Sequence, residues 1–420
     1  MSDSNKRHLY VLCLIVLISG IGYGIISPII PVYAEELEAT SVEIGVMVAS
    51  FAVFQVAFQA PGGLLSDRIG PKRIIFSGLV LISFSSFLFT LTEDIYLFMV
   101  FRAIEGSGTG MIFPSVSAYV FSISSSENRG SYMGTFLTFW ILGFTMGPAI
   151  GGVLADQYGI LTPFYFCSGI SLLAIILMEL ILVNPEGSKE NDNEYIPFVD
   201  RVRSIVRKPG MPAVLFRGFT IQFNNGVHMM ALALFLYEIV GLTKTLIGFV
   251  FAFEGLFMLV ATPIGGRLTD RIGRKKPIIF GGMGMAFTWY MMPLVENVHE
   301  NFGPFVLDEF GATCLLVIIT GIGVGLNSPA AMSLITETSP GKQKGTGMGV
   351  YGTISGTGFI AGPVLAGYLY GLDHTYPFRM GAGMALLSIT FVYFFVQETG
   401  VGKGAGNRDD GSRIGNEEKN

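Results

Sequence analysis

Long stretches without a charged side chain constrain this chain more than any other feature of its sequence. Nine windows of at least 18 residues contain no Asp, Glu, Lys or Arg: 9–33, 44–66, 74–92, 130–155, 157–178, 277–295, 310–336, 345–372 and 380–397. Three further apolar windows contain internal charges: 95–121, 212–237 and 245–266. A helix of about 20 apolar residues spans the hydrocarbon of a bilayer. The sequence therefore predicts an all-α integral membrane protein with twelve transmembrane helices.

The composition excludes a soluble enzyme. Charged residues make up 14% of the chain and hydrophobic residues 51%, whereas soluble proteins average about 25% charged residues. The sequence contains no Gly-x-x-x-x-Gly-Lys-Ser/Thr loop for nucleotide phosphates, so ATP-driven activity is not expected. We expect a lipid bilayer as the main surroundings, and no cofactor, metal or nucleic-acid partner.

The distribution of basic residues predicts the orientation in the membrane. Twelve spans place both termini on one side, and the segments on that side contain 22 of the 26 Lys and Arg. The opposite side has only Lys244 and Arg379, beside thirteen acidic residues. Because cytoplasmic loops carry an excess of Lys and Arg, we predict a multi-pass protein of the cell membrane with both termini in the cytoplasm.

The two halves of the chain repeat each other. Segment 62–73 matches segment 265–276 at eight of twelve positions, and the glycines and prolines between 106 and 148 recur 215 residues later. Each half contains six predicted helices, so the repeats have the same orientation and are related by an axis along the membrane normal. The predicted units are two six-helix bundles at 1–184 and 211–398. Between them, 185–210 is predicted to be a linker with an amphipathic helix on the inner leaflet, and 399–420 is predicted to be a disordered tail.

The repeated segment resembles a loop motif of the major facilitator superfamily, and the resemblance covers the whole chain. The pattern Gly-x-Leu-x-Asp-Arg-x-Gly-x-Lys is matched by Gly63, Leu65, Asp67, Arg68, Gly70 and Lys72, and the second copy includes Asp270 and Arg271. In that family the motif carboxylate faces the positive N-terminus of a neighbouring helix. The resemblance implies a conformational switch at these residues. A topogenic basic loop with a turn glycine is the alternative interpretation.

Segment 143–152 narrows the resemblance further. It matches the Gly-x-x-x-Gly-Pro-x-x-Gly-Gly pattern of antiporters in this superfamily and includes Gly147 and Pro148. Small residues allow close helix packing and a proline removes a backbone donor, so such a helix can bend at a moving interface. Tight packing alone would also explain a single glycine pair. The segment with Gly22, Pro28 and Pro31 similarly resembles the twelve-helix drug:proton antiporters.

Two charges in the fourth predicted helix point to proton coupling. A charge inside the hydrocarbon costs about 2.5–3.5 kcal/mol on insertion scales, so each one needs a partner or a task. Arg102 and Glu105 are three residues apart and can pair on one helix face. Arg102, Gly106 and Gly108 also fit the family motif Arg-x-x-x-Gly-x-Gly, whose arginine is implicated in proton coupling. A purely structural ion pair is the alternative interpretation.

A second candidate proton site combines His228 and Glu254. Each residue is thirteen positions from Gly241, so folding the helix hairpin there places them at one depth in the membrane. An acidic residue at mid-bilayer is functional by default, whereas a single membrane histidine more often has a structural role. We therefore rank Glu254 above His228.

The predicted substrate cavity is apolar with few polar anchors. It draws on polar residues of three helices and on the aromatic and Met residues near Glu254: Gln55, Gln59, Arg217, Asn224, Asn327, Phe251, Phe257 and Met258.

These features together predict a secondary transporter that works by alternating access. The leading hypothesis is proton-coupled antiport, exporting a small lipophilic compound or drug. A proton symporter or facilitator for a sugar or organic anion would use the same scaffold, with Arg102 and Arg217 available to an anion. The expected partners are protons and a small-molecule substrate, and the expected oligomeric state is a monomer.

Overall fold

Long helices dominate the computed structural model, which describes residues 3–125, 128–183, 210–298, 300–302, 305–338 and 344–396. Six helices form the first half: α1 (Asp3–Glu36), α2 (Ser41–Ile69), α3 (Pro71–Leu88), α4 (Ile95–Ile123), α5 (Arg129–Tyr158) and α6 (Thr162–Ile181). The seventh span is composite, made of α8 (Met211–Val227), the π-helix η1 (His228–Leu232) and α9 (Ala233–Glu238). The other spans are α10 (Lys244–Ile272), α11 (Lys275–Met291) with the 3₁₀ turn η2 (Met292–Asn297), α12 (Glu309–Thr338), α13 (Lys344–Tyr370) and α14 (Tyr376–Phe395).

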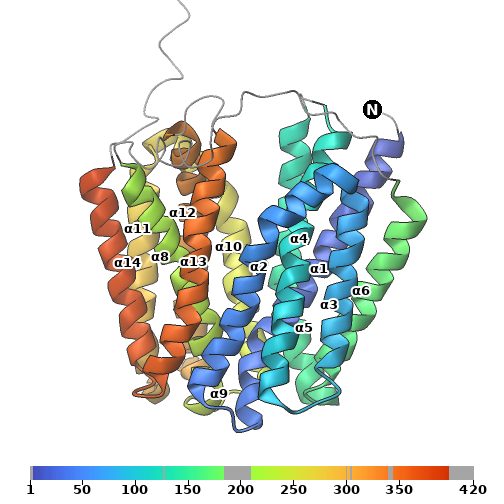
Figure 1. Cartoon of the computed structure of the whole chain (residues 1–420). Helices are drawn as coiled ribbons and strands as arrows, with labels where there is room; N and C mark the ends of the chain where they lie inside the picture. Colours follow the sequence, from blue (N-terminus) through green and yellow to red (C-terminus); the bar gives the residue numbers. More distant parts are fainter. Residues whose placement is uncertain are drawn as a thin grey trace, which may run out of the picture.

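The prediction of twelve membrane-spanning helices in two six-helix repeats is confirmed. Nine of the described helices are apolar and long enough to cross a bilayer on length and composition alone. Figure 1 shows the first six helices in one bundle and the helices from α8 onward in a second bundle beside it. The predicted tail at 399–420 lies outside the described residues, and so does the predicted linker at 185–210 with its helix, except for Gly210.

The same glycine contact holds the helices together in both bundles. The carbonyl oxygens of Phe51 and Gln55 on α2 occupy the places where side chains would begin at Gly106 and Gly110 on α4. The second bundle repeats this contact between α10 and α12, where the Glu254 carbonyl faces Gly321 in the same way. Helices that approach this closely need small residues at the crossing. The recurring glycines of the sequence therefore serve the shared scaffold.

Two features depart from regular α-helices. The π-helix η1 interrupts the seventh span at His228, and π-turns within helices are often found at functional sites. Between α11 and α12, β1 (Glu300–Phe302) pairs antiparallel with β2 (Phe305–Leu307). This small hairpin accounts for the longer connection in the second half, and it is the one addition to the all-α prediction within the described residues.

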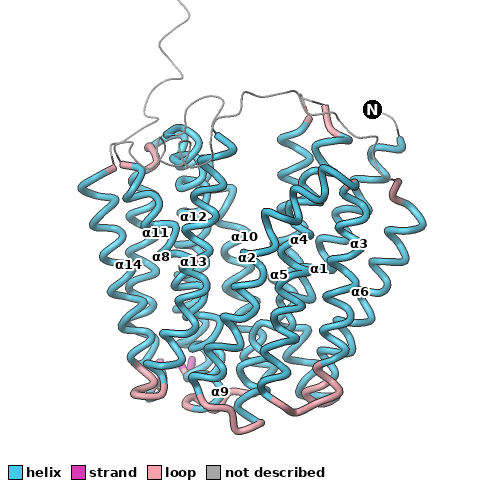
Figure 2. Tube along the Cα trace, in the orientation of Figure 1, coloured by secondary structure: helices cyan, strands magenta, loops and turns pink. Residues whose placement is uncertain are grey.

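The bundles make polar contacts at the end opposite the termini, which is called the distal end below. Helix α1 begins and α14 ends at the other end (Figures 1 and 2). At the distal end, the Glu36 carboxylate lies 2.6 Å from the Lys244 ammonium and accepts a 3.0 Å hydrogen bond from the Tyr237 hydroxyl. The backbone N–H of Thr245 donates to Asp156 at 2.7 Å. Each of these contacts joins one bundle to the other and closes this end.

Candidate functional site: a cavity between the bundles and two ion pairs

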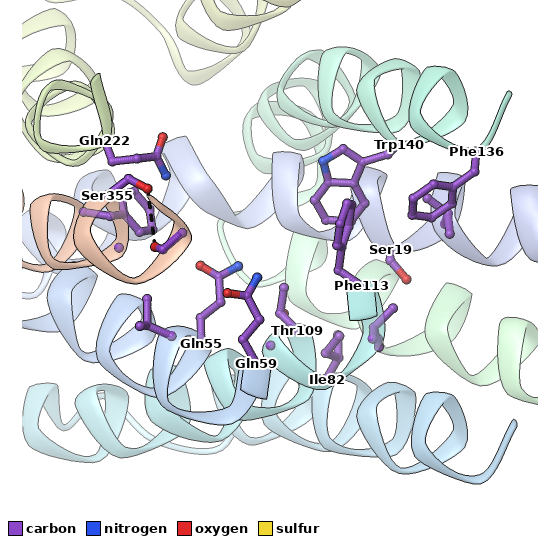
Figure 3. Close-up of a pocket in the computed structure, with 17 residues that line it drawn as sticks. Ser19, Gln55, Gln59, Ile82, Thr109, Phe113, Phe136, Trp140, Gln222 and Ser355 are labelled. Atoms are coloured by element: carbon purple, nitrogen blue, oxygen red, sulfur yellow. Dashed lines mark hydrogen bonds between the residues drawn. The ribbon is translucent and has the colours of Figure 1, made fainter. Parts of the chain in front are cut away.

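A cavity of about 290 Å³ lies between the bundles, in the half of the protein nearer the termini. The first bundle supplies most of its lining, from α1, α2, α3, α4 and α5, and the second bundle contributes α8 and α13. Figure 3 shows Gln55 and Gln59 side by side on α2, with Trp140 and Phe113 also at the cavity. The polar lining side chains are Ser19, Gln55, Gln59, Thr109, Trp140, Gln222 and Ser355.

The predicted cavity residues divide into two groups. Gln55 and Gln59 line the cavity, whereas the other six predicted residues do not. Arg217 and Asn224 point into the second bundle instead. The Arg217 guanidinium donates to the Ser388 hydroxyl at 2.7 Å, and the Asn224 amide donates to the Gly381 carbonyl at 3.2 Å, so both face α14.

The remaining predicted cavity residues lie on α10 and α12, outside this lining. Phe251 is buried against the His228 ring, with ring centroids 5.1 Å apart. Asn327 is buried as well, and its carboxamide has no hydrogen-bond partner among the described residues. Phe257 and Met258 are partly buried on α10. Phe251, Phe257 and Met258 are close to Glu254 in sequence, but none of them is among the residues that line the cavity.

Several lining residues were not anticipated from the sequence, among them Phe113, Trp140, Gln222 and Ser355. A weak signal for Trp140 was available, because it precedes the antiporter-like segment 143–152 on the same helix. Gln222 was harder to recognise because it lies between Thr220 and Asn224 in sequence, yet on a different face of α8. Its side-chain oxygen accepts a 2.7 Å hydrogen bond from Asn225.

The buried pair of Arg102 and Glu105 forms as the sequence spacing predicts. The Arg102 guanidinium donates to the Glu105 carboxylate at 2.8 Å, and the two residues are only 4% and 2% exposed. The guanidinium also lies 4.3 Å from the centre of the Phe51 ring on α2, a cation–π contact. The pair is therefore enclosed inside the first bundle, where separating the two charges would be costly.

Two routes connect this pair to the cavity. The Thr109 hydroxyl, which lines the cavity, donates to the backbone carbonyl of Glu105 at 3.0 Å, so cavity and carboxylate are one helical turn apart. The second route is aromatic. The centre of the Tyr23 ring lies 6.4 Å from that of Trp140 and 5.4 Å from that of Phe51, and the Phe51 ring in turn contacts the Arg102 guanidinium. A ligand that moves α4 or Trp140 would therefore disturb the surroundings of the pair.

The second pair, His228 and Glu254, also comes together. The His228 Nε2 atom and the Glu254 carboxylate are 2.7 Å apart, although the carboxylate lies off the direction of a well-aligned N–H bond. The Trp289 ring stands edge-on to the imidazole at 5.8 Å. Since His228 begins the π-helix, the altered local turn helps to set the position of its ring. This pair lies inside the second bundle and does not line the cavity.

The predicted switch residues are exposed at the end that carries the termini. Asp67 and Arg68 end α2, Asp270 and Arg271 end α10, and all four side chains are exposed. No hydrogen bond or ion pair joins Asp67 or Asp270 to another described residue. Within each copy of the motif the chain turns at a glycine with positive φ, +95° at Gly70 and +90° at Gly273, a conformation that other residues rarely adopt. Within the part of the chain that the structure describes, neither carboxylate is hydrogen-bonded to the N-terminus of a neighbouring helix in this distally closed conformation.

The glycines at the centre of the switch prediction lie at helix contacts. Gly63 faces Pro114 of α4, and a methyl group added at Gly63 would lie 3.6 Å from the Cβ atom of the proline. Gly147 packs against α1, where a methyl group would lie 2.6 Å from the Ile21 carbonyl oxygen. The Pro148 carbonyl lies against Gly248 of α10, across the boundary between the bundles. Segment 143–152 therefore lies at the contact between the two halves.

Comparison with known proteins agrees with this architecture. The family model for the Major Facilitator Superfamily matches residues 12–222 and 214–416. An uncharacterised MFS-type transporter of Methanocaldococcus jannaschii is 28% identical over 385 residues, which are 89% of this chain and 94% of the relative. The quinolone resistance protein NorA of Staphylococcus aureus is 25% identical over 401 residues, 92% of this chain and 96% of that protein.

Two solved structures share the fold. A bacterial homologue of the human lysosomal transporter Spinster, in an inward-facing and unoccupied conformation, superposes with a TM-score of 0.72 at 14% identity and covers 94% of this chain and 95% of its own. A human organic anion transporter superposes with a TM-score of 0.66 at 17% identity and covers 92% and 99%. At these identities the likeness concerns the fold.

Proposed function

The chain belongs to the major facilitator superfamily, and from that premise we propose that it is a proton-coupled antiporter that exports small lipophilic compounds by alternating access. One observation carries the proposal: the buried Arg102–Glu105 pair lies one helical turn from the cavity-lining Thr109. In this reading the structure represents the state with the distal end closed and the cavity on the cytoplasmic side. The similarity to NorA supports export as the direction.

Coupling follows from competition for the Glu105 carboxylate. While Arg102 donates to it, the guanidinium favours the charged form of the carboxylate and so opposes its protonation. Movement of α4 that lengthens the 2.8 Å contact would leave the carboxylate buried without its cation, and burial favours the protonated form. Substrate release and proton uptake are then linked through one helix. Glu254, paired with His228, is the second proton site in this proposal.

The switch residues complete the proposed cycle. In the distally open state, Asp67 and Asp270 would each face the N-terminus of a neighbouring helix and hold the cytoplasmic end closed. Breaking the contacts of Glu36 with Lys244 and Tyr237 would accompany that change. Both termini are cytoplasmic in this cycle, in agreement with the distribution of Lys and Arg.

The test is export from proteoliposomes with an imposed pH gradient, across a panel of dyes, drugs, sugars and carboxylates. We expect Glu105→Gln and Glu254→Gln to lose gradient-driven export, and the exposed loop variant Glu93→Gln to retain it as the matched control. The proposal is refuted if Glu105→Gln and Glu254→Gln both keep gradient-driven export. Counterflow of a sugar without proton movement would instead identify a facilitator.

A further inference from the structure

Among the residues that the structure describes, the cavity lining contains no ionisable side chain. Among the seventeen described residues that line it, none is Asp, Glu, Lys, Arg or His. Arg102 and Glu105, one helical turn from the lining residue Thr109, are already paired with each other. A charged ligand would have to give up its hydration here without gaining an opposite charge, which is unfavourable in a low-dielectric site.

The polar groups that line the cavity differ in what they leave available to a ligand. The hydroxyls of Ser19, Thr109 and Ser355 each donate their hydrogen to a carbonyl of their own helix, so only their oxygen lone pairs remain for a ligand. Gln222 uses its oxygen to accept from Asn225, so its NH₂ group is the part left for a ligand. A carbonyl acceptor on a ligand can therefore bind this NH₂ group, whereas the three hydroxyl oxygens can only accept from a ligand donor.

Further donors come from α2 and α5. Gln55 and Gln59 are four residues apart on one face of α2, and Figure 3 shows their carboxamides at the same part of the cavity. The Trp140 indole N–H can only donate. These groups surround the same space as the Gln222 amide, so two or more of them can reach the carbonyl groups of one ligand.

One wall of the cavity is aromatic. The Phe113 ring lies 5.2 Å from Phe136 and 6.4 Å from Trp140, in tilted and edge-to-face arrangements, and all three line the cavity. Such a wall favours flat rings. It would also attract a cation through its faces, but the lining provides no carboxylate to replace the hydration that a cation loses.

From these observations, and resting on the proposed function, we propose that the transported compounds are uncharged aromatic molecules with carbonyl acceptors, and that the cavity rejects cations and anions of the same shape. The carbonyl groups bind the amides of Gln55, Gln59 and Gln222, and the ring packs on Phe113 and Trp140.

Three compounds of one shape test this directly: benzanilide, its 4-trimethylammonio derivative and its 4-carboxylate. Binding is measured on the purified full-length protein, by radioligand competition without a pH gradient. We expect benzanilide to bind at least tenfold more tightly than either charged derivative. Equal or tighter binding of a charged derivative overturns the proposal, and so does the absence of binding by all three.

A gain-of-function variant strengthens the test. Gln59→Glu adds a carboxylate to the cavity, and we expect it to shift the preference at least tenfold toward the trimethylammonio compound. Gln157→Glu makes the same change at an exposed position at the distal end of α5 and should leave the preference unchanged. An unchanged preference in Gln59→Glu overturns the proposal.

The binding assay separates this proposal from the proposed function. Tight benzanilide binding without gradient-driven export would refute the antiport mechanism and leave the selectivity intact. Gradient-driven export of the charged derivatives in preference to benzanilide would refute the selectivity and leave antiport intact.

Discussion

Adding a methyl group at Gly248 should push the distal end open. The Cβ atom of Gly248→Ala would overlap the carbonyl oxygen of Pro148 and lie 2.9 Å from its carbonyl carbon, across the boundary between α10 and α5. Carbon atoms in contact are about 3.5–4.0 Å apart, so the helices must separate by about 0.6–1.1 Å. Overpacking of this kind costs about 1–3 kcal/mol. In the proposed cycle only the distally closed state makes this contact, so its population should fall by about 5- to 150-fold relative to the open state.

The separation can be measured with spin labels at the distal end. Tyr158 and Leu372 are suitable positions because they lie in different bundles and are 70% and 61% exposed. The native residues Cys13, Cys167 and Cys314 are replaced by alanine so that only the introduced cysteines are labelled. Pulsed dipolar spectroscopy in lipid then gives the distance distribution. We expect Gly248→Ala to add or enlarge a long-distance population.

Gly169→Ala is the matched control for this experiment. It makes the same substitution within α6, where the added methyl group meets nothing within 4 Å, so the distance distribution should not change. A monodisperse Gly248→Ala protein with the same distances as Gly169→Ala would refute the reasoning. It would mean that the α5–α10 contact does not report on the closed state.

Two further predictions concern the distal end and use the same label pair. Glu36→Gln removes the anion shared by Lys244 and Tyr237. Because the ion pair is partly exposed, we expect the closed state to lose about 0.2–1 kcal/mol of stability, and the distance distribution to shift less than in Gly248→Ala. An equal or larger shift would contradict this ranking. Glu238 is the last residue of α9 and lies at the distal end, just past the apolar stretch 212–237. Its side chain is partly exposed, and the partial burial of its carboxyl together with the neighbouring Glu35 carboxylate raises its pKa from 4.5 to about 7. Since the raised pKa belongs to the closed state, closure should be strongest below pH 4.5, weaken as the pH rises from about 4.5 to 7, and stay level above that range. Glu238→Gln should abolish this pH dependence. Stronger closure at high pH would show that the predicted sign is wrong.

The fold was predictable from the sequence because a bilayer leaves few choices. Every backbone group in the hydrocarbon must find a partner within the chain, so a long apolar window can only be a helix or part of a closed barrel. The windows of this chain are too long for barrel strands and recur in two equivalent sets. The hairpin at 300–307 was not anticipated, although Gly303-Pro304 is a turn signal in the sequence, because strands of three residues are too short to show an alternating pattern.

The candidate site was predictable only where spacing fixes geometry. Arg102 and Glu105 meet because residues three apart lie on one helix face, and His228 meets Glu254 because both are equally distant from the turn at Gly241. The cavity lining depends on how far each helix is rotated about its axis, which a nearly uniform apolar sequence does not reveal. Gln55 and Gln59 were recognised as cavity residues because they are polar residues of a largely apolar helix. Gln222 was not recognised, because it lies among other polar residues and the sequence does not show which of them faces the cavity.

The π-helix at His228–Leu232 affects how this chain should be aligned with others. A π-turn accommodates one more residue than the α-helical turn it replaces, so from η1 onward the side chains face directions that belong to neighbouring positions of a regular helix. Helix α1, the equivalent helix of the other half, runs from Asp3 to Glu36 as a single α-helix. An alignment of the two halves, or of relatives that lack the turn, therefore needs a one-residue gap near His228. Deleting one residue between 229 and 232 would restore a continuous α-helix and turn the histidine relative to the rest of its span.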